Sequence, residues 1–131
     1  IGEYLARLLA EDGLELVGKP DFQGTRRRVK FNRLTAEGKA ALVKENPAYG
    51  RVICRCETVT EGEILHAIRQ GAVTLDGVKR RVGAGLGRCQ GGWCMDRVLE
   101  LLARETGASP WEINQEGPGS PLLVRGKDDV V

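Results

Sequence analysis

The sequence lacks any apolar run that approaches the ~20 residues needed to cross a bilayer, so we expect no transmembrane segment. Its first residues, Ile1-Gly2-Glu3-Tyr4, show neither an initiator methionine nor the basic and apolar regions of a signal peptide. We therefore expect a fragment of a longer soluble chain, located in the cytoplasm.

His66 is the only histidine, and no serine or cysteine beside it completes a catalytic triad. We expect it to be a surface or packed imidazole.

The sequence has no large excess of charge of either sign. It contains 20 Lys and Arg and 18 Asp and Glu, which gives a net charge of +2. This balance does not indicate a nucleic-acid partner. A basic run, Arg26-Arg27-Arg28-Val29-Lys30, fits a solvated segment or edge strand, or else a docking surface.

The glycine-rich stretch Gly83-Ala84-Gly85-Leu86-Gly87 lacks the G-x-G-x-x-G register of a phosphate-binding loop and follows a predicted helix. A turn that wraps a ligand site explains them better than a phosphate-binding loop.

Four cysteines provide the main functional signal, arranged as C-x-C, a spacer of about thirty residues, and C-x4-C. Two close pairs joined through two short helices would bring four thiolates together, as a metal centre requires. A two-iron, two-sulfur cluster is the favoured interpretation. Structural zinc is the first alternative, although its pairs are commonly spaced C-x2-C to C-x4-C; disulfides or plain buried thiols are the others. The candidate ligands are Cys54, Cys56, Cys89 and Cys94.

The residues around the cysteines fit an anionic centre. Glycines allow backbone N–H groups to approach sulfur, and a helix that begins near Cys94 would direct its positive end at the site. Trp93 is expected to shield the centre from water. Asp76, Glu61 and Glu63 are expected to be helix-start residues rather than catalytic acids. The glycines are Gly85, Gly87, Gly91 and Gly92, and the candidate countercharges are Arg51, Arg55, Lys79, Arg88 and Arg97.

Apolar spacing and capping residues predict a mainly α fold. An amphipathic helix near the start of the chain should end at Gly13. Residues 51–56 should be extended, which would direct the sulfurs of Cys54 and Cys56 to the same side. We expect three parts: a helix-loop extension over 1–50, a small helical domain over 51–114, and an irregular tail over 115–131. The other expected helices span about 35–45, 61–70, 74–82, 95–106 and 109–112.

Three motifs carry a resemblance to a known family: Val52-Ile53-Cys54-Arg55-Cys56-Glu57, Thr74-Leu75-Asp76-Gly77-Val78-Lys79-Arg80-Arg81 and Gly87-Arg88-Cys89-Gln90-Gly91-Gly92-Trp93-Cys94. They resemble the bacterioferritin-associated-ferredoxin-like (BFD-like) [2Fe-2S] domain at the C-terminus of FAD-dependent, anaerobic-type glycerol-3-phosphate dehydrogenases. The resemblance covers about residues 46–113. The C-x4-C spacing departs from the C-x2-C of the free-standing ferredoxin and suits the flavoenzyme branch.

The resemblance implies that the four cysteines are cluster ligands in an electron-transfer module without substrate chemistry of its own. The parent would oxidise glycerol 3-phosphate on FAD and pass electrons toward a quinone. Its partners would be a flavin domain in the same chain and an electron-acceptor protein or quinone-linked subunit, which would allow peripheral contact with the inner membrane. A zinc-stapled interaction module is the alternative function, and isolated protein could carry zinc or an empty site.

Overall fold

The computed structural model describes residues 1–25 and 28–124. Helices dominate these ranges beside one two-stranded sheet, which confirms the predicted mainly α class. Arg26 and Arg27 of the predicted basic run, and residues 125–131 of the predicted tail, lie outside the described residues. The elements are α1 (Gly2–Glu11), η1 (Phe31–Arg33), α2 (Ala36–Glu45), η2 (Pro47–Gly50), β1 (Val52–Cys54), β2 (Val59–Thr60), α3 (Glu61–Arg69), α4 (Leu75–Val82), α5 (Met95–Thr106) and η3 (Pro110–Glu112).

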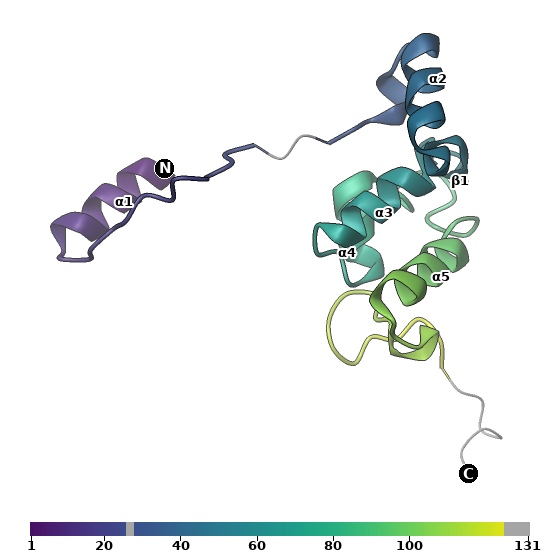
Figure 1. The fold of residues 1–131 in the computed structure, drawn as a ribbon. Helices are drawn as coiled ribbons and strands as arrows, with labels where there is room; N and C mark the ends of the chain where they lie inside the picture. The colour runs from purple at the N-terminus through teal and green to yellow at the C-terminus, as the bar shows by residue number, and fades with distance from the viewer. Residues whose placement is uncertain (26–27, 125–131) are drawn as a thin grey trace.

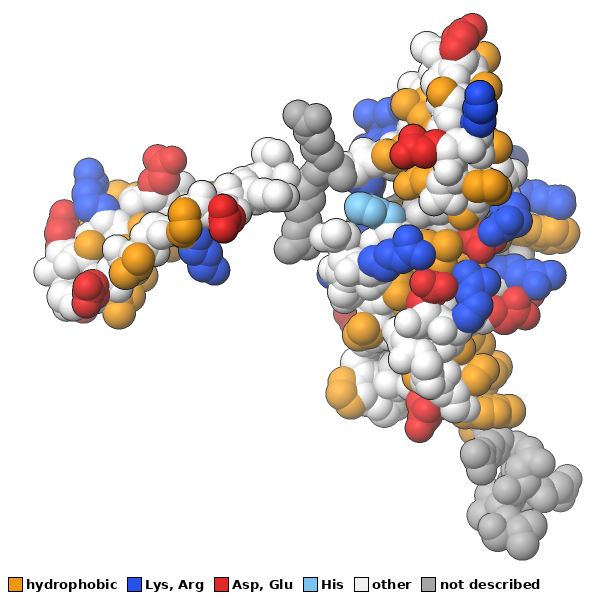
Figure 2. All heavy atoms as spheres, viewed as in Figure 1, with side chains coloured by type: hydrophobic (Ala, Val, Ile, Leu, Met, Phe, Trp, Pro, Cys, Tyr) orange, Lys and Arg blue, Asp and Glu red, His pale blue; other side chains and the backbone are white. Residues whose placement is uncertain are grey.

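Helices α3, α4 and α5 form the body of the molecule, and α1 lies apart from it at the end of an extended segment (Figure 1). The amphipathic α1 buries none of its residues, and its hydrophobic side chains are visible on the surface in Figure 2. No described helix has the length and apolarity needed to span a membrane. The four largest fully buried side chains come from the three body helices: Ile64, Leu75, Val78 and Leu102.

Capping residues set the limits of the body helices where the sequence predicts them. Thr60 and Glu63 form a capping box at the start of α3, and Thr74 accepts a hydrogen bond from the Gly77 N–H at the start of α4. Gly83 and Gly107 end α4 and α5 in the left-handed conformation, with φ of 88° and 74°. Glycine adopts this conformation without a Cβ penalty, which explains both helix ends.

The prediction of extended chain through Cys56 is wrong beyond Cys54. Strand β1 ends at Cys54, and residues 55–58 form a turn that returns the chain along β2. Thr58 adopts a φ of +51° in this turn, and its N–H donates to the Arg55 carbonyl. The return strand is only two residues long because Thr60 already caps α3. A hairpin this short gives little alternating sequence pattern from which to predict it.

The short helices η1 and η2 lie against the start of α3. Phe31 is buried, and its backbone N–H donates to Glu63 Oε1 at 3.1 Å. The Tyr49 ring covers Gly62, where a built Cβ would lie 2.7 Å from ring carbons. Ala48 joins the core cluster. Glycine at position 62 therefore allows η2 to lie directly on the first turn of α3, while the division of the chain at residue 50 stays a prediction.

The described part of the tail is irregular but closes over the start of α4. The Leu75 N–H donates to the Asn114 carbonyl at 3.2 Å, and the Asp76 N–H donates to the Gln115 carbonyl at 2.8 Å. These are first-turn N–H groups without partners inside the helix, so the tail supplies acceptors that the helix lacks. The Gln115 side chain also donates to Asp76 Oδ1.

Replacing Glu63 with Gln should lower the free energy of unfolding by about 1–3 kcal/mol. The buried carboxylate accepts from the N–H groups of Phe31 and Thr60 and from the Thr60 hydroxyl, and an amide NH2 would face one of these donors. Urea denaturation of Glu63→Gln tests this, with Glu3→Gln on the exposed α1 as the matched control. Equal stability of the two variants would contradict the proposed buried acceptor role.

Candidate metal centre

The four thiols gather where the β1–β2 hairpin meets the loop between α4 and α5. Cys54 ends β1, Cys56 lies in the hairpin turn, Cys89 lies in the loop, and Cys94 is the residue before α5. The Cys56 sulfur lies 3.8 Å from the sulfur of Cys54 and 3.8 Å from that of Cys89. Cys54 and Cys94 are buried, each 1% exposed, whereas Cys56 and Cys89 are exposed. The group therefore has an inner side and an outer edge.

Gly87 allows the two loops to meet. A Cβ at this position would lie 2.3 Å from the Cys56 sulfur and 2.9 Å from Glu57 Oε1, closer than Cβ atoms approach other atoms in proteins. Gly91 has a φ of +92° and would place a Cβ 2.7 Å from Met95 Cε. The missing side chain of Gly87 leaves space for the Cys56 sulfur, and that of Gly91 leaves space for Met95, reasons for glycine that the loop motif alone does not reveal.

Backbone donors and burial distinguish the four thiols. The N–H groups of Trp93 and Gly91 hydrogen-bond to Cys89 and lower its pKa below the ordinary value of 9.0. Desolvation and hydrogen bonds with the Cys54 and Cys89 thiols raise the pKa of the exposed Cys56, and burial together with the neighbouring Cys54 raises the pKa of Cys94 to about 12. A bound cation would favour the thiolate at every position, so metal binding here would release protons.

The ligand chemistry fits an iron-sulfur cluster. Four thiols, glycines that open the loop and N–H donors beside sulfur are the features that such clusters use. Within residues 1–25 and 28–124, no three His, Cys, Asp or Glu side chains form a group suited to one metal ion. A two-iron cluster does not need three ligands around one ion, since four cysteines are shared between its two irons.

Comparison with known proteins agrees with this chemistry. Residues 52–104 match the BFD-like [2Fe-2S] binding domain. This segment belongs to that family. No solved structure shows significant similarity to the chain.

Several oxidoreductases are similar to the chain. The glycerol 3-phosphate dehydrogenase of Caloramator mitchellensis is 46% identical over 127 residues, which are 95% of this chain and 26% of that protein. The hydrogen cyanide synthase protein HcnB of Pseudomonas aeruginosa is 48% identical over 43% of this chain and 12% of its own length. One component of the anaerobic glycerol-3-phosphate dehydrogenase of Escherichia coli K12 is 37% identical over 49% of this chain and 12% of its own length. The chain thus spans about a quarter or less of these relatives.

The side chain of Trp93 lies at the outer edge of the BFD-like site. Trp93 is 57% exposed, and the Arg55 guanidinium lies over its ring, 4.2 Å from the centroid. Its backbone N–H reaches Cys89. The Trp93 backbone therefore helps to lower the pKa of the Cys89 thiol, a role that residue type does not reveal.

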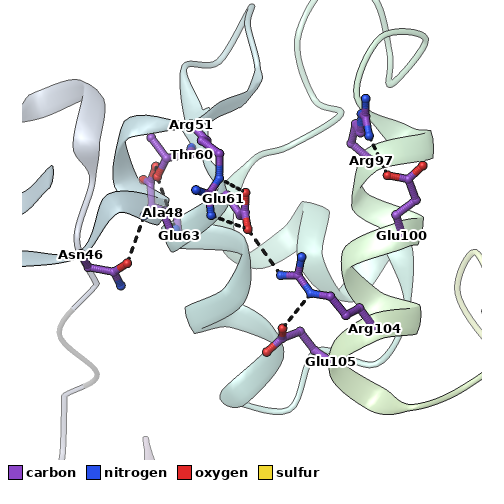
Figure 3. Close-up of polar contacts among 10 residues, drawn as sticks. All are labelled: Asn46, Ala48, Arg51, Thr60, Glu61, Glu63, Arg97, Glu100, Arg104 and Glu105. Atoms are coloured by element: carbon purple, nitrogen blue, oxygen red, sulfur yellow. Dashed lines mark hydrogen bonds and ion pairs between the residues drawn. The ribbon is translucent and has the colours of Figure 1, made fainter.

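An ion-pair network joins the segment before β1 to α5 (Figure 3). Glu61, 7% exposed, accepts hydrogen bonds from Arg51 at 2.5 and 3.0 Å and from Arg104 at 3.4 Å. The bond from Arg51 holds the pKa of Glu61 below its ordinary 4.5. The pair therefore adds stability above that pH, which is lost as the pH falls through the lowered value. The sequence predicts Glu61 only as a helix-start residue and Arg51 only as a countercharge near the centre.

The other predicted candidates take ordinary surface positions. Arg97, a candidate countercharge, pairs with Glu100 at 2.9 Å. His66 is exposed on α3 and is visible on the surface in Figure 2, as predicted for a surface imidazole. Neither side chain takes part in the thiol group.

Replacing Gly87 with Ala should remove most of the iron from protein reconstituted anaerobically, since the new methyl group would displace the Cys56 sulfur. Iron content per chain measures the effect. Gly117→Ala is the matched control, because its Cβ would meet no atom within 4 Å. Full iron content in Gly87→Ala would show that the close approach does not define the site.

Iodoacetamide should alkylate Cys89 before Cys56 in the reduced, metal-free protein near neutral pH. Both thiols are exposed, but N–H donors lower the pKa of Cys89, while desolvation and hydrogen bonds with the Cys54 and Cys89 thiols raise that of Cys56, so thiolate forms at Cys89 at lower pH. Cys94, with a pKa of about 12, should react last. Peptide mass spectrometry after partial labelling measures the order in which the cysteines are alkylated. The urea-unfolded chain is the control, because its thiols lack these contacts. Faster labelling of Cys56 would contradict the assigned donors.

Proposed function

We propose that the chain is an electron-transfer domain that holds a [2Fe-2S] cluster on Cys54, Cys56, Cys89 and Cys94. The observation that carries the proposal is the convergence of these thiols, with the Cys56 sulfur 3.8 Å from those of Cys54 and Cys89, within a segment that matches the BFD-like [2Fe-2S] binding domain. Such a cluster takes up and releases one electron at a time. The chain needs no catalytic acid or base for this role.

In this proposal the four cysteines hold the cluster from two different environments. Cys54 and Cys94 provide the buried side, and Cys56 and Cys89 provide the edge that faces solvent. The N–H groups of Gly91 and Trp93 favour negative charge on the Cys89 sulfur. Hydrogen bonds to cluster sulfurs and solvent exposure both tune a reduction potential, so this edge is where the protein would set it.

The parent enzyme that we propose is a flavin-dependent glycerol-3-phosphate dehydrogenase in the cytoplasm. The similarity to the Caloramator mitchellensis protein of that name covers 95% of the chain and so includes residues outside the family segment. The similarity to HcnB covers only 43%. In this proposal a flavin domain of the same protein oxidises glycerol 3-phosphate on FAD, and the chain relays the electrons toward a quinone or another acceptor. A peripheral membrane location would follow from a quinone-linked partner.

Structural zinc remains the alternative cofactor because four thiolates bind it well. The tight C-x-C pair gives it less support than the two-iron cluster, since paired ligands of structural zinc are commonly spaced C-x2-C to C-x4-C. A zinc-stapled domain would serve interaction rather than electron transfer, so the two proposals predict different redox behaviour.

Protein purified anaerobically should contain iron and acid-labile sulfide in equal amounts, about two of each per chain, and should give a paramagnetic signal after one-electron reduction. Chemical analysis and electron paramagnetic resonance measure these. Cys54→Ser, which alters an inner ligand, should lose the native signal, and the isolated chain should not oxidise glycerol 3-phosphate with any dye. Stoichiometric zinc with no reducible signal would reject the cluster, and turnover by the isolated chain would reject the relay role.

A further inference from the structure

The outer edge of the thiol group is surrounded by a distinct surface. The exposed Cys56 and Cys89 mark it, and Leu86 and Trp93 flank it with exposed fractions of 54% and 57%. Arg55 lies over the Trp93 ring, and Arg88 is adjacent to Cys89 in the chain. We call the four flanking residues, Arg55, Leu86, Arg88 and Trp93, the cluster-edge face.

Unpaired positive charge characterises this face. Arg88 makes no side-chain hydrogen bond or ion pair with any described residue, and the Arg55 guanidinium contacts only the Trp93 ring among the interactions of the described chain. Glu57 provides one partly buried carboxylate here. Most other arginines of the helical body, including those at positions 51, 69, 80, 97 and 104, pair with carboxylates. The cations next to the exposed thiols are therefore available to an external partner.

More cations adjoin the face. A cavity of about 260 Å³ includes Leu86 and Glu57 in its lining, which also carries Arg28, Lys30 and Arg33. None of these three cations forms an ion pair with a residue of the described ranges. The positive surface thus continues past Leu86, and a partner centred on the exposed thiols would meet further cations there.

We propose that the cluster-edge face docks an acidic surface of a separate one-electron redox protein, the electron acceptor. This inference rests on the proposed function and specifies the electron acceptor by the charge of its surface. A tryptophan and arginines around a small apolar centre are typical of binding hot spots. A small patch with exposed cations suits a transient encounter steered by charge rather than a permanent apolar domain contact. One electron passes from the chain to the acceptor, and no bond forms or breaks.

The test uses two probe proteins of opposite charge: an acidic flavodoxin and basic cytochrome c. Isothermal titration calorimetry under anaerobic conditions at low ionic strength should show binding of flavodoxin and not of cytochrome c. The affinity should fall steeply as salt is added. Arg55→Glu/Arg88→Glu should weaken flavodoxin binding by at least about tenfold, because both rim charges become repulsive.

A control variant separates this face from net charge. Arg7→Glu/Lys44→Glu changes the net charge by the same amount on α1 and α2, and it should leave the affinity within about twofold. Arg88→Gln is a milder variant with no described contact to lose; it should weaken binding severalfold while circular dichroism stays unchanged. Iron and sulfide analysis of each variant reports separately on the cluster, so failure of docking and failure of the proposed function are distinguishable.

Four results would overturn the proposal. Equal loss of affinity in the control and the face variants would assign binding to net charge alone. Tighter binding of cytochrome c would reverse the inferred charge of the partner. Self-association at low salt that Arg55→Glu/Arg88→Glu abolishes would assign the face to a second copy of the chain. Binding by the isolated chain but not by the longer parent enzyme would assign it to a domain of the same protein.

Discussion

The contact between the Gly87 backbone and the Cys56 thiol is the constraint on which the site depends. It closes the hairpin against the loop between α4 and α5, and the absent Cβ would otherwise lie 2.3 Å from sulfur. Helices α3 and α4 span the distance between the two cysteine pairs, and α5 begins directly after Cys94. The helical core thus fixes the ends of both loops, while glycine allows them to touch.

The same closure creates two unlike sides. Two thiols are buried in the core, and two face solvent among unpaired arginines and exposed apolar side chains. Burial on the inner side raises the pKa of Cys94, whereas backbone donors on the outer side lower that of Cys89. A buried side suits retention of a cofactor, and an exposed edge suits exchange of electrons with a partner. One small domain therefore combines both requirements of a relay.

Local signals made much of this architecture predictable from the sequence. Thr60, Thr74, Gly83 and Gly107 set helix limits through contacts within a few residues, which a sequence shows directly. Some contacts that the sequence does not predict join residues far apart in the chain, and others lie in short irregular segments.

Glu61 pairs with Arg104 across 43 residues, and the Asn114 carbonyl accepts from the Leu75 N–H. The hairpin after Cys54 escaped prediction because its return strand is two residues long. Trp93 has a backbone role that no residue-type argument could assign.

Mössbauer spectroscopy of iron-57-labelled protein tests most directly the central claim that the four cysteines hold a [2Fe-2S] cluster. We predict two ferric ions, each in tetrahedral sulfur coordination, coupled into a diamagnetic pair as isolated; a single paramagnetic ferric site would contradict this claim.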